Sequence, residues 1–299
     1  MVKEFEYAGK AMGTDYSVAI VCDSKELADK TYEQVKKDIH AYETRFSRFL
    51  PTSELSQLNK QRDMVVSETF LKVTTKAYQL FIETHGAFNP LMQIARFGYE
   101  KSRDDESYTP KNNIKESYDI NFSTTMIDPK TRRIRLQEGQ KLDFGGFLKG
   151  YLAEILAKKI ESSSERITGV IVNLGGDIHT RGLDKGGFKF VFSIYNPILD
   201  NDETLVTLYN ESLATSGTYK RSWLIDDKKI HHILDISGIT NPDQDIVSAS
   251  IIHADGATTE AYTKVLLSMD YDRAVQLLQK KHLSWLIIRN NGKVTQHIL

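Results

Sequence analysis

The sequence predicts an α+β fold in which an antiparallel sheet is packed with several long helices. Segments with strand character outnumber helical ones, and most of the strands follow one another through short turns. The length of 299 residues is enough for one large domain or two small ones with a substantial buried core. These three observations together indicate the class.

The N-terminal half is expected to begin with a strand and two long helices. Residues 16–22, "YSVAIVC", have strand character, and a polar stretch then leads into a helix. The apolar stripe of this helix is predicted to comprise Ala28, Val35, Ile39, Tyr42, Phe46 and Phe49. A second helix is predicted over 68–84, and the polar residues 102–118 are typical of a surface loop.

The C-terminal half is expected to alternate short strands with helices. A buried strand at 169–174 and an antiparallel pair are predicted from β-branched runs and alternation. The elements predicted in this half are short strands within 118–144, a helix at 147–160, strands at 169–174, 188–195, 204–210 and 246–254, helices from 255 and over 272–281, and a terminal hairpin around "NG".

Composition excludes several function classes. The net charge is −1, with 39 basic and 40 acidic residues, so no overall field attracts nucleic acid or an anionic membrane. The single cysteine, Cys22, excludes an intrachain disulfide framework and is expected in the core. No window resembles a signal peptide, a lipobox or a membrane span, which predicts a cytoplasmic protein without a transmembrane segment.

Two glycine-rich stretches depart from simple core patterning. In residues 142–156, Gly145-Gly146 precede a helix with Lys149 in its first turns, which suits a phosphate but also an ordinary strand–helix turn. In residues 172–182, Gly175-Gly176-Asp177 follow a buried strand. They could form a phosphate or substrate turn, or a bulge or hairpin corner.

Two further stretches carry polar groups suited to chemistry. His231 and His232 would point to opposite faces of an extended segment, so one could face a pocket as a proton acceptor and the other could face solvent. On a helix, Thr259, Glu260 and Thr263 form an oxygen-rich group that suits Mg²⁺. The alternative is a helix start rich in residues of capping type.

The ordered motifs resemble those of the ApbE-type flavin transferases (FAD:protein FMN transferases) over nearly the whole chain. Eight segments follow the family order: "AMGTDYSV", "FSRFLPTSELSQLN", "GAFNP", "LDFGGFLKGYLAE", "VNLGGDIHTRG", "ATSGTYKR", "HHILD" and "TTEAYTKVLL". The resemblance implies a T-fold-like single unit over residues 1–299, in which two subdomains could flank the FAD site.

The resemblance also implies a reaction and its partners. FMN passes from FAD to a threonine or serine hydroxyl of an acceptor protein, a phosphoester forms, and AMP leaves with the help of Mg²⁺ on the diphosphate. The acceptor would be a reductase or respiratory subunit with a short Ser/Thr motif. A non-catalytic FAD-binding protein and an FAD pyrophosphatase that releases FMN and AMP are the alternatives.

The family motifs assign roles to individual residues. Lys149 would contact FAD, and His232 would border the cofactor and act as the base for the acceptor hydroxyl. The flavin nucleotide would be lined by Met12, Phe49, Ala87, Phe88 and Asn89. The metal would be held by the Gly146 carbonyl and by Thr263, with Thr259 and Glu260 beside them.

The chain departs from the family pattern at several of these positions. Phe49 stands where a tyrosine is usual, Asn89 and Glu154 replace aspartates, and the loop after His232 is shorter. The largest change is Thr259, which occupies the place of a metal-binding aspartate. A small helical rotation could let Glu260 serve instead; otherwise Mg²⁺ would be held weakly or through water.

Overall fold

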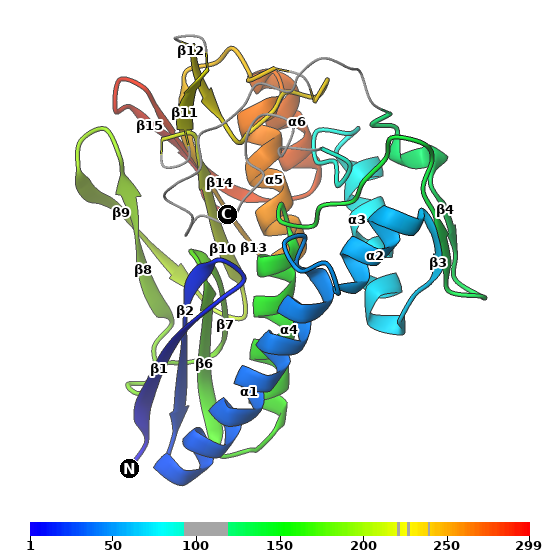
Figure 1. Ribbon diagram of the computed structural model, residues 1–299. Helices are drawn as coiled ribbons and strands as arrows, with labels where there is room; N and C mark the ends of the chain where they lie inside the picture. Colours follow the sequence, from blue (N-terminus) through cyan, green and yellow to red (C-terminus); the bar gives the residue numbers. More distant parts are fainter. Residues whose placement is uncertain (93–118, 220–221, 226–227, 239) are drawn as a thin grey trace.

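A computed structural model describes residues 1–92, 119–219, 222–225, 228–238 and 240–299, and its centre is one eight-stranded antiparallel sheet (Figure 1). In spatial order the strands are β1 (Lys3–Ala11), β2 (Thr14–Cys22), β6 (Ile167–Leu174), β7 (Asp177–Gly182), β10 (Ser212–Gly217), β13 (Ile246–His253), β14 (Ser284–Arg289) and β15 (Val294–His297). The predicted antiparallel α+β fold is therefore confirmed.

Tight hairpins join neighbouring strands at one end of the sheet. Met12 and Gly13 connect β1 to β2, and Gly175 and Gly176 connect β6 to β7. All four residues have positive φ, as the two central positions of a type I′ hairpin turn require. The glycines of "VNLGGD" thus form a hairpin corner, the structural alternative considered for that stretch.

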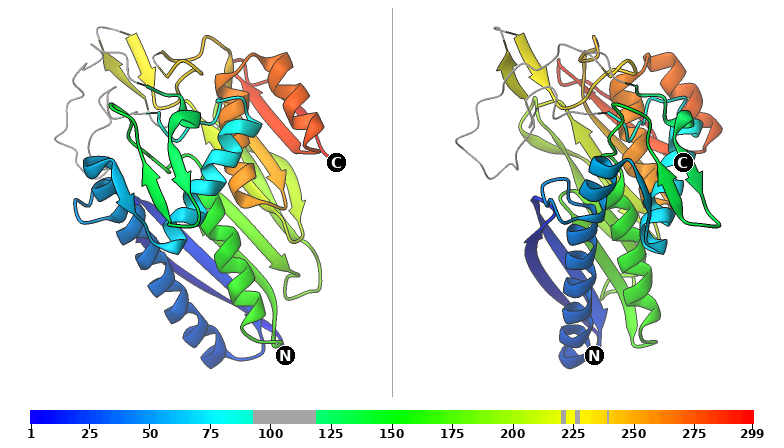
Figure 2. Two further views of the ribbon diagram at one scale, coloured as in Figure 1. Left: turned by 90° about the vertical axis from the view of Figure 1, so that its right-hand side faces the viewer. Right: turned by 45° about the vertical axis from the view of Figure 1, so that its right-hand side comes forward.

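Three long helices cover one face of the sheet. They are α1 (Lys25–Phe46), α4 (Leu148–Ser162) and α5 (Gly256–Ser268), and α1 and α4 run side by side along the strands (Figure 2). Ser24 caps α1 and Asp255 caps α5, each by accepting a backbone N–H of the first turn. Val18 and Ile20 of β2 pack with Ile39 and Leu152 in the core beneath these helices.

The opposite face is partly covered by the hairpin of β8 (Phe190–Asn196) and β9 (Asn201–Leu208). Its buried residues Ile194 and Leu208 pack on Leu213 of β10 and Ile252 of β13. These central strands are therefore buried on both faces, and nearly every residue of β13 is buried, including Ser248 and Ser250.

A further layer packs outside the helices. It contains α2 (Glu54–Gln61), α3 (Glu68–Glu83) and the small sheet of β3 (Asp63–Val65), β5 (Arg133–Arg135) and β4 (Met126–Asp128). Stacked and edge-on rings of Phe46, Phe70, Phe144 and Phe147 fill the space between this layer and α4. The remaining elements are α6 (Tyr271–Lys280), the 3₁₀ turn Phe122–Thr124 and the ribbon of β11 (Ser222–Ile225) and β12 (Lys228–His231).

Most predicted elements are confirmed to within a few residues, with three kinds of exception. The helix α1 ends at Phe46, and Ser47 turns to extended backbone, so the prediction that Phe49 continues the apolar stripe is wrong. The sequence patterns do not predict α2, β1, β3, β7, β10, β11 or β12. The predicted loop 102–118 lies outside the described residues. No described helix has the length and apolar character needed to cross a bilayer.

Candidate functional site

The helices α4 and α5 touch at two glycines and cap each other. A Cβ on Gly150 would lie 2.3 Å from the carbonyl oxygen of Gly256, so the two backbones can approach this closely only without side chains there. Glu260 of α5 accepts the N–H of Gly150 at 2.9 Å, in the first turn of α4. In return, Glu154 of α4 accepts the N–H of Gly256 at 2.7 Å. Each helix therefore supplies a carboxylate for the N-terminus of the other.

Four charged side chains meet at this crossing, and we call them the ion cluster: Lys149, Asp177, Glu260 and Lys264. Lys149 Nζ donates to Glu260 Oε1 at 2.8 Å and also pairs with Asp177 at the start of β7. Lys264 Nζ lies 3.4 Å from the same Oε1 and 3.1 Å from the main-chain oxygen of Glu260. Two ammonium groups thus balance two carboxylates.

Burial and mutual attraction set the protonation of the ion cluster. Burial and the neighbouring Glu260 carboxylate raise the pKa of Asp177 to about 6, against the opposing attraction of Lys149. Burial would also raise the pKa of Glu260, but Lys149 and Lys264 outweigh it and lower that pKa. For Lys149, the two carboxylates outweigh burial and raise its pKa. Glu260 and Lys149 are therefore charged at neutral pH.

The exposed edge of the ion cluster is cationic. The side chains of Glu260 and Asp177 are only 1% and 5% exposed, whereas those of Lys149 and Lys264 are 17% and 19% exposed. The lysine side chains are therefore the part of the ion cluster that a molecule approaching from solvent can reach, whereas the two carboxylates are covered. This arrangement favours an anion.

The two threonines of α5 bond to backbone oxygens of their own helix. Thr259 Oγ1 donates to the Asp255 carbonyl at 2.7 Å. Thr263 Oγ1 donates to the Glu260 carbonyl at 2.7 Å, so it accepts the hydrogen bond from Ser216 Oγ, also at 2.7 Å. Both threonines are fully buried.

The predicted Mg²⁺ ligands do not present a free set of oxygen atoms in this arrangement. Both carboxylate oxygens of Glu260 are engaged by N–H donors, and the hydroxyls of Thr259 and Thr263 are engaged as described. Gly146 lies beside a lysine, because a Cβ there would be 3.9 Å from Cε of Lys264. A divalent cation would add two positive charges to a balanced cluster, so these residues do not fit it.

The predicted flavin-binding residues of the "GAFNP" turn lie next to the ion cluster but differ in what they contact. Phe88 packs against Phe147, and a Cβ on Gly146 would lie 3.3 Å from the Phe88 ring. Asn89 accepts the N–H of Leu91 and donates to the carbonyl of residue 120, so its amide holds the loop together. Ala87 is buried in the apolar cluster around α5.

Met12 and Phe49 lie on turns near the same end of the helices. Met12 has φ of 54° in the β1–β2 turn, and its N–H donates to Glu43 on α1. Phe49 is 43% exposed, with the guanidinium of Arg48 4.6 Å from its ring centre. Arg48 also pairs at 3.5 Å with Asp143, which accepts the N–H of Gly145. The Phe49 turn is thus tied to the glycine pair before α4.

His232 directly follows β12, on a segment held by Asn241. The Asn241 side chain accepts the N–H of His231 and donates to the carbonyls of His231 and Ile233. Ile233 packs in the same apolar cluster as Ala87 and Tyr262 of α5. The structure therefore brings the neighbour of His232 into the core that also holds the "GAFNP" turn. The role of His232 stays a prediction.

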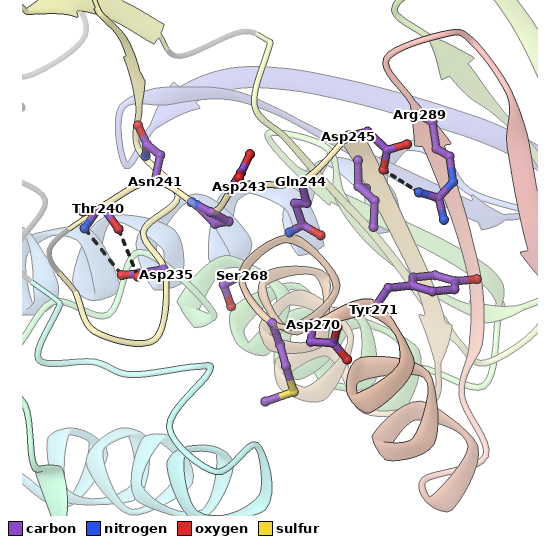
Figure 3. Close-up of a pocket in the computed structure, with 13 residues that line it drawn as sticks. Asp235, Thr240, Asn241, Asp243, Gln244, Asp245, Ser268, Asp270, Tyr271 and Arg289 are labelled. Atoms are coloured by element: carbon purple, nitrogen blue, oxygen red, sulfur yellow. Dashed lines mark hydrogen bonds and ion pairs between the residues drawn. The ribbon is translucent and has the colours of Figure 1, made fainter.

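A separate cavity of about 550 Å³ lies at the C-terminal end of α5 (Figure 3). Its walls come from the loop after His232, the junction of α5 with α6, and β14. The lining residues are Asp235, Thr240, Asn241, Pro242, Asp243, Gln244, Asp245, Ile246, Ser268, Met269, Asp270, Tyr271 and Arg289. None of the site residues that the sequence predicts is among them. The cavity and the ion cluster are therefore two different places on the same helix.

The sequence does not predict a role for two members of the arrangement. One is Lys264, although its spacing four residues after Glu260 is that of a helical ion pair. The other is Ser216, which lies within the "ATSGTYKR" motif. Asp177 is predicted only as part of a phosphate or substrate turn or a hairpin corner, because its partner Lys149 is on another element.

Comparison with known proteins gives a consistent result. Residues 12–287 match the family model described as the ApbE family. The chain is 23% identical to an FAD:protein FMN transferase of Klebsiella pneumoniae, covering 93% of this chain and 86% of the relative. It is 22% identical to the enzyme of that name from Salmonella typhimurium, covering 95% and 84%.

Solved structures show the same fold. An ApbE protein from Thermotoga maritima superimposes with a TM-score of 0.86 at 26% identity, covering 98% of this chain and 97% of that one. The apo form of Pseudomonas stutzeri flavinyl transferase ApbE gives 0.84 at 16% identity, covering 99% and 95%. The similarity therefore extends over nearly the full described chain.

Proposed function

The chain belongs to the ApbE family, and we propose that it transfers the FMN part of FAD to a threonine or serine hydroxyl of an acceptor protein. The relatives reported above are named FAD:protein FMN transferases, and the chain covers 86% and 84% of their length. The observation that carries the proposal on this chain is the cationic edge of the ion cluster, which lies beside the glycine pair at the start of α4. We propose that residues 1–299 act as one unit in this reaction.

The diphosphate of FAD is assigned to this edge. Lys149 lies in the first turn of α4, where the helix dipole and the ammonium group both favour negative charge. Gly145 and Gly146 have no side chains that would keep a phosphate away from the backbone. Phe49, Met12 and the turn of Ala87, Phe88 and Asn89 are assigned to the flavin nucleotide, with the exposed Phe49 ring offering an apolar face.

His232 is assigned as the base for the acceptor hydroxyl. It takes the hydroxyl proton on a ring nitrogen as the oxygen forms a bond to the phosphorus on the FMN side. The bond from that phosphorus to the bridging oxygen breaks, and AMP leaves with the electron pair. This is in-line phosphoryl-type transfer, which depends on positioning and on charge neutralisation.

The acceptor is proposed to be a reductase or respiratory subunit with a short Ser/Thr motif. Transfer of FMN differs from hydrolysis only in whether a protein hydroxyl or water attacks, and the same phosphate contacts serve both. The resemblance assigns Gly146, Thr259, Glu260 and Thr263 to Mg²⁺, but these residues as arranged do not fit a divalent cation, so no step of this proposal uses a metal. A cytoplasmic location likewise remains an expectation from the sequence.

The test is an incubation of the full chain with FAD and purified candidate acceptor domains, with AMP and protein-bound flavin as readouts. We expect AMP in equal amount to the flavin that stays fluorescent on the denatured acceptor. AMP with free FMN would indicate a pyrophosphatase, and FAD binding without AMP would indicate a non-catalytic binding protein. Either result would overturn the transfer proposal.

The role of His232 is tested by His232→Ala with His231→Ala as the neighbouring control. We expect His232→Ala to lower the rate of AMP release by at least about 100-fold, because a positioned base contributes roughly that much. FAD affinity should stay within about two-fold, since the proposed base acts on the acceptor. Equal losses in both variants would point to disruption of the segment held by Asn241.

A further inference from the structure

Lys264 is a largely buried lysine of the ion cluster, and the mechanism proposed above gives it no role. It follows Thr263 on α5, and its ammonium group contacts the carboxylate and the carbonyl of Glu260. Its aliphatic stem lies beside Gly146, at the glycine pair before α4. A lysine that is only 19% exposed, next to a proposed phosphate site, requires an explanation beyond surface solvation.

The charges of the ion cluster indicate what it can receive. Lys149 and Lys264 already neutralise Asp177 and Glu260, and the carboxylates lie behind the ammonium groups. Thr259 adds no charge, and its hydroxyl is held by the Asp255 carbonyl. A metal ion that approached would therefore be repelled by two ammonium groups before it reached a carboxylate.

A diphosphate, in contrast to a metal ion, would be attracted by the two lysines of the ion cluster. Its negative charges would meet the side chains of Lys149 and Lys264, which are 17% and 19% exposed and carry compact charges with rotatable N–H donors. Lys149 and Lys264 reach the same carboxylate oxygen of Glu260 from two different helices, so their ammonium groups are neighbours. Their spacing is fixed by a carboxylate that is itself held by the N–H of Gly150.

We infer that Lys264 supplies, together with Lys149, the positive charge that neutralises the FAD diphosphate in this chain, so that FAD binds without a divalent metal. This inference rests on the proposed function, because it concerns the same FAD. Lys264 is then a substrate-binding residue, and Glu260 positions both lysines rather than a metal ion. Thr259 is tolerated because no carboxylate is needed at its position.

The inference is tested first on the unmodified chain. FAD affinity is measured by flavin fluorescence, once in EDTA and once in about 5 mM MgCl₂. Direct metal binding is measured separately, by electron paramagnetic resonance of Mn²⁺ without FAD. We expect FAD affinities within about two-fold of each other and no Mn²⁺ site at micromolar concentration. FAD binding that requires Mg²⁺, or a micromolar Mn²⁺ site, would overturn the inference while leaving the proposed function intact.

Lys264→Met then removes the charge and keeps most of the side-chain length. We expect it to weaken FAD binding in EDTA by at least about ten-fold, because one of the two proposed positive charges is lost. Lys264→Arg keeps that charge and should weaken FAD binding less. The control is Lys158→Met on α4. Lys158 pairs with Glu154 at the same spacing of four residues, but its side chain is exposed. Equal FAD affinity in the Lys264→Met and Lys158→Met variants would overturn the inference.

The failure of the inference and the failure of the proposed function give different results. If the unmodified chain binds no FAD with or without Mg²⁺, the proposed function fails and the inference fails with it. If Lys264→Met is unfolded by circular dichroism, Lys264→Gln and Lys264→Arg replace it. The comparison of EDTA with Mg²⁺ on the unmodified chain still decides the question.

Discussion

The middle of α5 and its C-terminal end both gather carboxylates, but they hold them in different ways. In the ion cluster, Glu260 and Asp177 are buried and paired with ammonium groups. At the cavity, Asp270 caps α6 by accepting the N–H of Arg273, and Asp235 accepts from Thr240 within its own loop (Figure 3). Asp245 forms a partly exposed pair with Arg289.

The two regions also differ in how far apart in the sequence the bonded residues lie. The cavity carboxylates of Asp235 and Asp270 bond to residues three to five positions away, so they stabilise turns and helix ends. Glu260 bonds to Lys149 across 111 residues of sequence, and Asp177 bonds to it across 28. A hollow lined with acidic residues can thus be ordinary loop structure, whereas the smaller ion cluster joins three elements, α4, α5 and β7, that lie far apart in the sequence.

The largest expected effect that tests this contrast is the loss of Glu260. Glu260→Ala would leave two buried ammonium groups with one carboxylate and remove the acceptor for the Gly150 N–H. We expect it to lower the free energy of unfolding by about 3–5 kcal/mol, as for other broken buried pairs. Asp245→Ala, which breaks the partly exposed pair, should cost less than about 1 kcal/mol. Urea unfolding of both variants measures the difference.

Similar losses in the two variants would show that burial does not distinguish the two regions. Glu260→Gln separates charge from hydrogen bonding, because an amide oxygen can still accept the N–H of Gly150. We expect its stability to fall between those of the unmodified chain and Glu260→Ala. A Gln variant as stable as the unmodified chain would contradict a role for the carboxylate charge.

The fold could be predicted from the sequence largely because its signals are local. Helical spacing located α3, α4 and α6, and alternation with "NG" located the terminal hairpin. The same spacing failed at Phe49, because an apolar residue after a helix end can continue the pattern by chance. The eight-residue helix α2 is too short for periodicity to detect, although Ser53 provides its cap.

The candidate site could be predicted only in part, because its pairings depend on tertiary structure. Motifs pointed to Lys149, Gly146 and Glu260, which do lie together. Glu260 and Lys264 have helical ion-pair spacing that the sequence displays. Nothing local indicates that Asp177 faces Lys149, since this depends on the β6–β7 hairpin packing under α4. The direction of the Glu260 side chain likewise depends on how closely two glycines let α4 and α5 approach.

The dependence of folding stability on pH tests a buried histidine in the sheet beneath the ion cluster. His179 lies two residues after Asp177 on the same face of β7 and is fully buried, with Nδ1 2.6 Å from Ser212 Oγ. Burial, with Lys158 and Arg181 nearby, lowers its pKa from 6.5 to about 3. Below about pH 6.5 the histidine is therefore protonated in the unfolded chain but stays neutral in the folded chain. The contribution of neutral His179 to stability is present at pH 7 and is lost as the pH falls toward 3.

The expected size is about 2 kcal/mol between pH 7 and pH 5, at roughly 1.4 kcal/mol per pH unit below 6.5. Urea unfolding at both pH values, on the unmodified chain and on His179→Gln, isolates the contribution as a difference. His40→Gln, at an exposed position on α1, is the control for the loss of a surface histidine. A pH dependence that His179→Gln does not reduce would exclude His179 as its source.

The smallest expected effect is at the cavity, and it decides which of the two regions binds FAD. Arg289 pairs with Asp245, and its guanidinium lies 5.0 Å from the ring centre of Tyr271. Arg289→Met should cost about 1 kcal/mol of stability, since partly exposed ion pairs and cation–π contacts contribute on that scale. Its FAD affinity should equal that of Arg273→Met, an exposed arginine lost from α6. A ten-fold weaker FAD affinity in Arg289→Met alone would move the nucleotide from the ion cluster to the cavity, because Arg289 lines the cavity and no residue of the ion cluster does.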